Sequence, residues 1–295
     1  MTGALIEEFM VTLSDTITLY VLIALFALAI GSFLNVLIYR LPLMLRADWL
    51  KEYAELTHNK TFKIDQTNDV NLFWPRSACP DCKTPIPAHH NIPLLSYFLL
   101  HGHCRFCNNK IHWRYPFVEL VTCLLSLAAF ATFGINWTFL FSVGFISLII
   151  PAMMIDMKHQ ILPDSLTLGL LWLGLIANTN ALFTTLPNAV LSAAGAYLSL
   201  WLFIQLFYLL TKKIGMGHGD FKLFAAFGAW FGWTPLPLIL FLASLIGAIY
   251  GLIWLKLTHQ NKDTAIPFGP FLGIAGLIVL FFGHAITAMI YNFPI

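Results

Sequence analysis

Charged residues are scarce in this sequence. Of its 295 residues, 10% are Asp, Glu, Lys or Arg and 59% are hydrophobic, and the mean hydropathy is +0.78. Soluble domains carry about 25% charged residues, so a single globular core cannot bury this much apolar surface. The composition therefore excludes an ordinary soluble protein and predicts an all-α polytopic membrane protein, with lipid around its spans. No nucleic-acid partner is expected.

The N-terminus lacks the basic residues that precede the apolar core of a signal peptide. It carries Glu7, Glu8 and Asp15 instead. The apolar run at residues 16–39 is also too long for a signal peptide, and we predict that it is the first transmembrane helix. After Tyr115 the chain is nearly all apolar, and seven further spans are predicted at residues 116–134, 136–155, 164–182, 188–211, 221–232, 236–256 and 268–292. The segment 221–232 is short, because a full crossing needs about 20 residues.

Basic residues are absent from every second connection of this topology. Cytoplasmic loops carry the excess of Lys and Arg. With an external N-terminus, all sixteen Lys and Arg fall on the cytosolic side, and outer connections such as residues 184–188 have none. The charges thus support about eight spans and a division into three parts. These are an N-terminal segment with the first helix (1–39), a cytosolic domain (40–115) and a seven-helix membrane domain (116–295).

Cysteine is also rare, yet four of the five cysteines form two pairs with the same spacing. The pairs are Cys79 with Cys82 and Cys104 with Cys107, and each is followed by an isoleucine after the same gap. Such a repeat is typical of two knuckles that bind one tetrahedral zinc ion. Two disulfides are the alternative, but thiols stay reduced in the cytosol, which favours zinc. Four thiolates leave no open coordination position, so the predicted role of the zinc is structural.

Acidic residues are few in the apolar part of the chain, where ionisable groups are functional candidates. After Tyr115 they are Glu119, Asp156, Asp164, Asp220 and Asp263. Each has a purely structural interpretation. Asp156 would pair with Lys158 at a helix end, Asp164 and Asp220 would be N-caps, and Asp263 would be solvated in a loop. For Glu119 a first-turn position near the helix dipole and a contact with a cationic substrate group are equally favoured.

Asp156 and Asp220 are stronger candidates for a functional site as a pair, because the topology puts both at cytosolic ends of spans and at similar depth. Two carboxylates held close together share a proton. The ionised one then activates water, and the protonated one polarises a peptide carbonyl. Gly215, Gly217 and Gly219 remove side chains next to Asp220, so a substrate backbone has room to approach. We therefore predict an aspartyl protease with Asp156 and Asp220 as its catalytic dyad.

An ordered series of motifs resembles the type IV prepilin leader peptidases. The series consists of GSFLNV at residues 31–36, YRLP at 39–42, PRS at 75–77, NIP at 91–93, RYP and VEL within 114–120, ID and LPD within 155–164, GHGD at 217–220, and IPFGPF at 266–271. The resemblance covers nearly the whole chain after the first 20 residues. GHGD alone, which resembles the family's GxGD motif, is weak evidence, whereas the ordered series is specific.

The resemblance implies a bifunctional enzyme of the bacterial inner membrane, with the cysteine domain and both catalytic aspartates on the cytosolic side. Members of the family cut a short basic leader from type IV prepilins and from type II secretion pseudopilins, typically between Gly and Phe. They then methylate the new N-terminal amine with S-adenosylmethionine. The resemblance also implies that Asp156 and Asp220 are the dyad, and that Cys79, Cys82, Cys104 and Cys107 bind the metal.

No site for the methyl donor is visible in the sequence, because no Gly-rich loop follows a strand. Gly31 and Asn35 share one helical face and would line such a site together with Glu119. Close helix packing at Gly31 and an interhelical hydrogen bond from Asn35 are the favoured alternative. For the whole protein, the alternatives are a presenilin-like intramembrane protease without methyl transfer and a proton- or cation-coupled transporter that uses the two aspartates.

Overall fold

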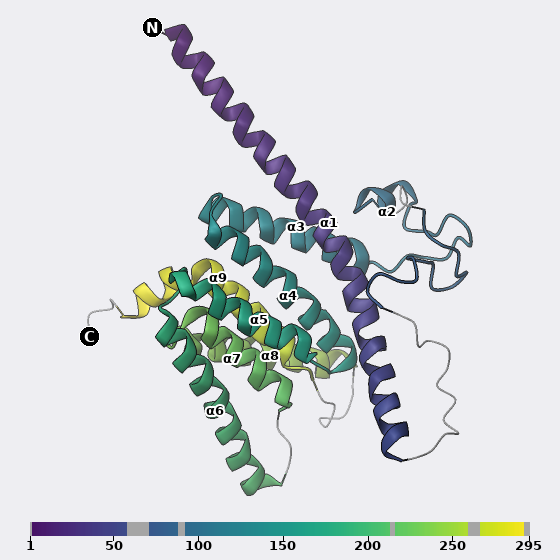
Figure 1. Ribbon diagram of the computed structural model, residues 1–295, viewed down its shortest axis with the longest axis vertical. Coiled ribbons are helices and arrows are strands. Elements are labelled where there is room, and N and C mark those ends of the chain that lie inside the picture. Colours follow the sequence, from purple (N-terminus) through teal and green to yellow (C-terminus); the bar gives the residue numbers. More distant parts are fainter. Residues whose placement is uncertain (1, 58–70, 88–91, 213–215, 259–265, 292–295) are drawn as a thin grey trace. The chain divides into compact units, whose positions relative to one another are not determined.

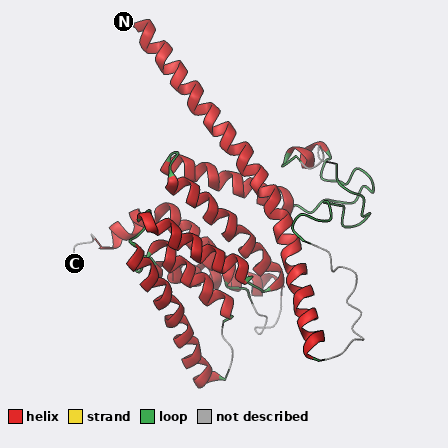
Figure 2. Cartoon of the chain, viewed as in Figure 1, coloured by secondary structure: helices red, strands yellow, loops and turns green. Residues whose placement is uncertain are grey.

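The computed structural model describes residues 2–57, 71–87, 92–212, 216–258 and 266–291. This part of the chain is helical with connecting loops and contains no strand (Figure 2). Two compact units are formed, residues 1–131 and 132–295. The expected all-α class is therefore confirmed. Asp263, predicted to be solvated, and Gly215 lie outside the described residues.

The first unit begins with one uninterrupted helix, α1 (Thr2–Leu56), 55 residues long (Figure 1). The predicted span 16–39 lies inside it, but α1 does not end at Arg40. The residues beyond Arg40 are mostly Leu, Met, Ala, Arg, Lys and Glu, which are strong helix formers, and Pro42 does not end the helix. The predicted boundary between residues 39 and 40 thus falls within a helix, and the three-part division stays a prediction.

Two further helices complete the first unit, the short α2 (Leu95–Leu99) and α3 (Arg114–Phe133). A Cβ atom added to Gly31 would lie 2.7 Å from the Cα of Glu119, so only glycine lets α1 approach α3 this closely. One turn later, the Asn35 amide donates a hydrogen bond of 3.0 Å to the carbonyl of Tyr115. The favoured interpretation of Gly31 and Asn35, helix packing and an interhelical hydrogen bond, is confirmed.

The second unit holds the remaining helices. They are α4 (Trp137–His159), α5 (Asp164–Ala177), the 3-10 helix η3 (Asn178–Asn180), α6 (Leu186–Thr211), α7 (His218–Phe231), α8 (Leu236–Thr258) and α9 (Gly269–Tyr291). Helix α7 packs against α5, α6 and α9, and ten of its 14 residues are buried. This helix is therefore enclosed by protein, which explains how a segment too short to cross a bilayer is accommodated.

The predicted count of about eight spans is not confirmed. Five helices of the described residues are long and apolar enough to cross a membrane: α1, α3, α4, α6 and α8. Helices α5 and α7 have 14 residues each, fewer than the roughly 20 that a crossing needs. In α9, residues 269–283 form a shorter apolar helix by the same criterion. Several apolar helices nevertheless make this a membrane protein.

Buried polar side chains fix the C-terminal end of α7. The Asn178 amide donates to the carbonyls of Ala229 and Trp230 at 2.8 and 3.0 Å. The Ser192 hydroxyl donates to the carbonyl of Gly228 at 2.8 Å. A Cβ atom at Gly228 would lie 2.6 Å from the backbone oxygen of Ser192. The height and rotation of α7 are thus set at the end opposite Asp220.

Candidate active site and metal centre

The helices of the second unit bring Asp156 and Asp220 together. Asp156 lies in the last turn of α4 and is 5% exposed, whereas Asp220 is the third residue of α7 and is 8% exposed. The two carboxylates are close enough to interact electrostatically. Neither forms an ion pair with a basic side chain in the part of the chain that the structure describes. The expected pairing of Asp156 with Lys158 is therefore wrong.

A third element, the start of α9, reaches the same place. The backbone N–H of Gly269 donates a hydrogen bond of 3.0 Å to Asp156 Oδ2. A Cβ atom at Gly269 would lie 2.6 Å from that oxygen and 3.0 Å from Leu162 Cδ1. Leu162 also lies 2.7 Å from the Cβ position of Gly219. Leu162 thus packs against a glycine next to each carboxylate.

Asp220 is held differently. Its Oδ1 atom is buried and has no hydrogen-bond partner among the described residues, and the Cβ position of Gly217 lies 3.7 Å from Oδ2. Gly217, rather than Asp220, is the N-cap of α7, so the N-cap interpretation of Asp220 is wrong. Oδ1 therefore has no partner to displace, and the neighbouring Gly217 has no side chain; when protonated, this carboxyl group can donate to a peptide carbonyl.

The third aspartate, Asp164, does not join the pair. It is the first residue of α5, whose N-cap is Pro163, so Asp164 is not the predicted N-cap. Both of its carboxylate oxygens accept hydrogen bonds from Lys222 Nζ, at 2.6 and 2.7 Å. Lys222 follows Asp220 by two residues, which places it about 200° around the helix. This ion pair ties α7 to α5 on the side away from the dyad.

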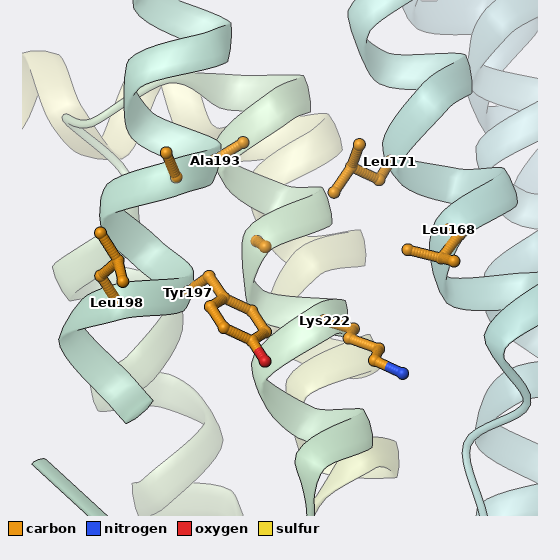
Figure 3. Close-up of a pocket in the computed structure, with 8 residues that line it drawn as sticks. Leu168, Leu171, Ala193, Tyr197, Leu198 and Lys222 are labelled. Atoms are coloured by element: carbon orange, nitrogen blue, oxygen red, sulfur yellow. The ribbon is translucent and has the colours of Figure 1, made fainter. Parts of the chain in front are cut away.

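Lys222 also borders an apolar groove of about 480 Å³ on that side of α7 (Figure 3). Leu168 and Leu171 of α5 form one wall, and Ala193, Tyr197 and Leu198 of α6 form the other. The groove contains neither catalytic candidate. It therefore belongs to the apolar exterior of the unit and not to the carboxylate site.

In the first unit the four paired cysteines form a cluster. Their sulfur atoms all lie within 4.8 Å of one another, and the sulfurs of Cys79 and Cys107 are 3.8 Å apart. Zn–S bonds of about 2.3 Å in a tetrahedron put two sulfurs about 3.8 Å apart. All four thiols are free, as is Cys123. The cluster therefore has the donor set and the size to bind a metal ion.

The two pairs have the same local backbone, as the repeated spacing predicted. In each pair, the N–H four residues after the first cysteine closes a turn. Lys83 N–H donates to the carbonyl of Cys79, and Asn108 N–H donates to that of Cys104. Lys83 and Asn108 both have left-handed φ angles, 58° and 59°. Each pair is thus a knuckle that presents two sulfurs on one side.

Hydrogen bonds and neighbouring sulfurs shift the pKa values of these thiols in opposite directions. The Thr84 hydroxyl and N–H lower the pKa of Cys82 to about 6, and the N–H groups of Cys107 and Phe106 lower the pKa of Cys104. Cys107 accepts from the N–H of Asn109, which lowers its pKa, but desolvation and the three neighbouring sulfurs raise it to about 12. The four groups cannot all ionise beside one another, and a divalent cation removes this conflict.

Sequence reasoning left the role of Glu119 open, and the structure supplies a different one. Glu119 is the sixth residue of α3, beyond the first turn, and it is 9% exposed. Its Oε2 accepts a hydrogen bond of 2.8 Å from the N–H of Leu94, which has a left-handed φ of 57°. Glu119 thus holds the chain at the start of α2, between the two knuckles in sequence.

Gly269 is the neighbour of Asp156 that sequence reasoning missed. It stood in the IPFGPF motif, so its position was noted, but no role was predicted for it. Spacing along the chain cannot show that a backbone N–H 113 residues away reaches Asp156.

Both units of the chain match known protein families. Residues 25–133 match the family described as "Bacterial Peptidase A24 N-terminal domain", and residues 142–252 match the "Type IV leader peptidase family". The first match contains the cysteine cluster and the second contains both Asp156 and Asp220. No solved structure matches.

Full-length relatives carry one name, "Prepilin leader peptidase/N-methyltransferase". The protein of Legionella pneumophila is 55% identical over 268 residues, 91% of this chain and 93% of the relative. That of Aeromonas salmonicida is 47% identical over 90% of this chain and 91% of the relative. That of Pseudomonas aeruginosa is 46% identical over 91% and 92%.

Proposed function

This chain belongs to the type IV leader peptidase family. We propose that it cleaves the leader from type IV prepilins and pseudopilins and then methylates the new N-terminus. The observation that carries the peptidase activity is the pair of buried carboxylates, Asp156 and Asp220. They come from two helices, interact with each other and have no basic partner among the described residues. The arrangement supports an aspartyl protease.

The proposed reaction uses one proton shared by the dyad. The ionised carboxylate takes a proton from water while the water oxygen bonds to the scissile carbonyl carbon. The protonated carboxyl group gives its proton to the carbonyl oxygen, which becomes a hydroxyl. The C–N bond then breaks as the leaving nitrogen takes the proton that the first carboxylate had removed from water. The second carboxylate takes back a proton from the hydroxyl group. The products are a carboxylic acid and a free amine.

The orientation in the membrane is also proposed. All sixteen Lys and Arg fall on one side of the predicted topology, and this side is cytosolic by the positive-inside rule. Asp156 lies in the last turn of α4, a candidate span, so the dyad is at a membrane boundary. A prepilin has an apolar helix with its leader in the cytosol, so its scissile bond lies at that depth in the bacterial inner membrane.

The cysteine cluster fits a structural zinc ion. Cys79, Cys82, Cys104 and Cys107 would hold the ion through four thiolates, which leaves no position for water or substrate. The metal would stabilise the loops between α1 and α3, where the described residues include only the five-residue helix α2. Zinc therefore supports the fold of this segment and takes no part in peptide cleavage.

S-adenosylmethionine is the proposed methyl donor, and it supplies an electrophilic methyl group for the free amine. The first unit offers polar atoms that fit such a zwitterionic ligand. Asn35 Oδ1 and Arg114 Nε are buried without a partner among the described residues. The amide nitrogen of Asn35 bonds the carbonyl of Tyr115, the residue that follows Arg114. Asn35 would accept from an ammonium group, and Arg114 would donate to a carboxylate.

The deciding experiment incubates membranes that contain the protein with a prepilin and radiolabelled S-adenosylmethionine. Leader loss and methyl incorporation are both measured. Asp156→Asn and Asp220→Asn are expected to abolish leader loss and to leave methylation of a precleaved pilin intact. Full cleavage by either variant would show that the dyad assignment is wrong. Cleavage within an apolar span, with no leader removed, would favour a presenilin-like protease instead.

A further inference from the structure

The two carboxylates of the dyad lie at opposite ends of their helices. Asp220 is in the first turn of α7, where the helix dipole stabilises negative charge and where Gly217 faces its carboxylate. Asp156 is in the last turn of α4, where the dipole of α4 destabilises negative charge. Asp156 is therefore the carboxylate that needs a hydrogen-bond donor from another element.

The structure shows that donor on α9. The N–H of Gly269, the first residue of that helix, donates to Asp156 Oδ2 at 3.0 Å. An N–H at the start of a helix has no partner within its own helix, so this donor is available without any cost to α9. One bonded oxygen also fixes the rotation of the carboxylate group about its last bond.

We propose that Gly269 is a positioning residue of the peptidase, whose N–H fixes the rotation of the Asp156 carboxylate and whose missing side chain lets α9 reach that carboxylate. The inference rests on the proposed peptidase function and deepens it, because it adds a third element to a site otherwise built from α4 and α7. No other residue type is compatible with this contact. A Cβ atom there would lie 2.6 Å from Asp156 Oδ2 and 3.0 and 3.1 Å from the two Cδ atoms of Leu162.

Neighbouring charged groups do not supply the same support. Lys222, on α7, is bound to Asp164 at 2.6 Å. Lys158 and His159, on α4 itself, are exposed, and so is His218 at the start of α7. Gly269 is thus the hydrogen-bond donor that the structure places on Asp156.

The test measures steady-state cleavage of a prepilin by the purified full-length protein. Gly269→Ala keeps the N–H but displaces the carboxylate, and kcat is expected to fall about 10²- to 10³-fold, as when a preorganised donor is lost. KM should change little, because the scissile bond and not the substrate's apolar helix meets this site. Methylation of a precleaved pilin should stay at the wild-type rate. Gly269→Pro removes the N–H at a first helical position, where proline is otherwise tolerated, and should abolish cleavage.

Gly273→Ala is the matched control, one turn later on α9. Its nearest neighbours would be side-chain atoms of Met153 and Ile149 in α4 and not a carboxylate, so this variant tests the effect of crowding between α9 and α4 by itself. This variant should keep kcat within threefold of the wild type. The double variant Leu162→Ala with Gly269→Ala removes the contact between the added methyl group and Leu162. The contact of that methyl group with Asp156 remains, so cleavage should not return.

Four results would overturn the inference. The first two are a kcat of Gly269→Ala within threefold of the wild type and equal losses of kcat in Gly269→Ala and Gly273→Ala. The other two are recovery of cleavage when Leu162→Ala is added to Gly269→Ala, and equal kcat values for Gly269→Ala and Gly269→Pro. Wild-type protein and Asp156→Asn are assayed alongside. If the wild type fails to cleave, or Asp156→Asn cleaves normally, the proposed function itself is wrong and not only the role of Gly269.

Discussion

Replacing Asn178 should destabilise the protein more than almost any other single polar change. Asn178 is 1% exposed and makes four hydrogen bonds to backbone groups. Its amide donates to the carbonyls of Ala229 and Trp230, and its oxygen accepts from the N–H groups of Phe183 and Thr184. Each such bond contributes about 1 kcal/mol net, and a buried group left unpaired costs about 1–3 kcal/mol. Because the two N–H groups are only part-buried, we expect Asn178→Ala to lower the free energy of unfolding by about 3–5 kcal/mol.

The same change should reach the active site, because α7 carries Asp220 at one end and is held by Asn178 at the other. Equilibrium unfolding in mixed micelles gives the stability, and prepilin cleavage at a temperature where the variant is still folded gives the activity. Asn180→Ala is the control, since Asn180 lies two residues later in the same 3-10 helix, is exposed and should change stability by no more than about 0.5 kcal/mol. A loss below 1 kcal/mol for Asn178→Ala, with normal cleavage, would refute this reasoning.

Three further predictions concern the metal, the exposed ion pair and the helix crossing. Cys104→Ser should lower bound zinc well below the roughly one ion per chain expected for the wild type, as measured by metal analysis; a wild-type protein with two disulfides and no metal would contradict this. Lys222→Gln should cost no more than about 1 kcal/mol of stability, because its partner Asp164 has a side chain that is 59% exposed, and cleavage should stay within a few-fold of normal; a large loss of cleavage would give Lys222 a role in the chemistry. Gly31→Ala should destabilise by about 1–3 kcal/mol, because the methyl group would meet the Glu119 backbone at 2.7 Å; Gly169→Ala, whose methyl group would meet only Leu148 at 3.9 Å, is the control in the same unfolding assay.

The candidate site residues could be singled out from the sequence because their types are rare in an apolar chain. Asp156 and Asp220 stood out as acids among hydrophobic residues, and the repeated cysteine spacing identified the four sulfurs that the structure brings together. The helix boundaries also followed from composition, as α6 shows: it was predicted at residues 188–211 and observed as Leu186–Thr211.

The errors have a common physical origin, which is that neighbours in space decide what a local pattern does. Asp164 and Asp220 both precede apolar runs, as N-caps do, yet Asp164 binds Lys222 and Asp220 interacts with Asp156. The length of α1 was underestimated because hydropathy marks where a span ends, but helix propensity continues past Arg40. The role of the Gly269 N–H could not be predicted from the sequence, because nearly every residue has a backbone N–H and only the fold decides which one lies next to Asp156.

The hydrogen bond between Asn35 and Tyr115 also imposes an order of events during synthesis. Its two residues are separated by 80 positions, and a ribosome adds about 5–20 residues per second. The first helix therefore enters the bilayer roughly 4 to 16 seconds before the carbonyl that Asn35 will bond emerges. During this interval a polar amide in the membrane has no final partner, which is costly in hydrocarbon. Within α1 the amide reaches only the Gly31 carbonyl, at 3.4 Å, so the shorter bond to Tyr115 can form only after α3 has followed α1 into the membrane.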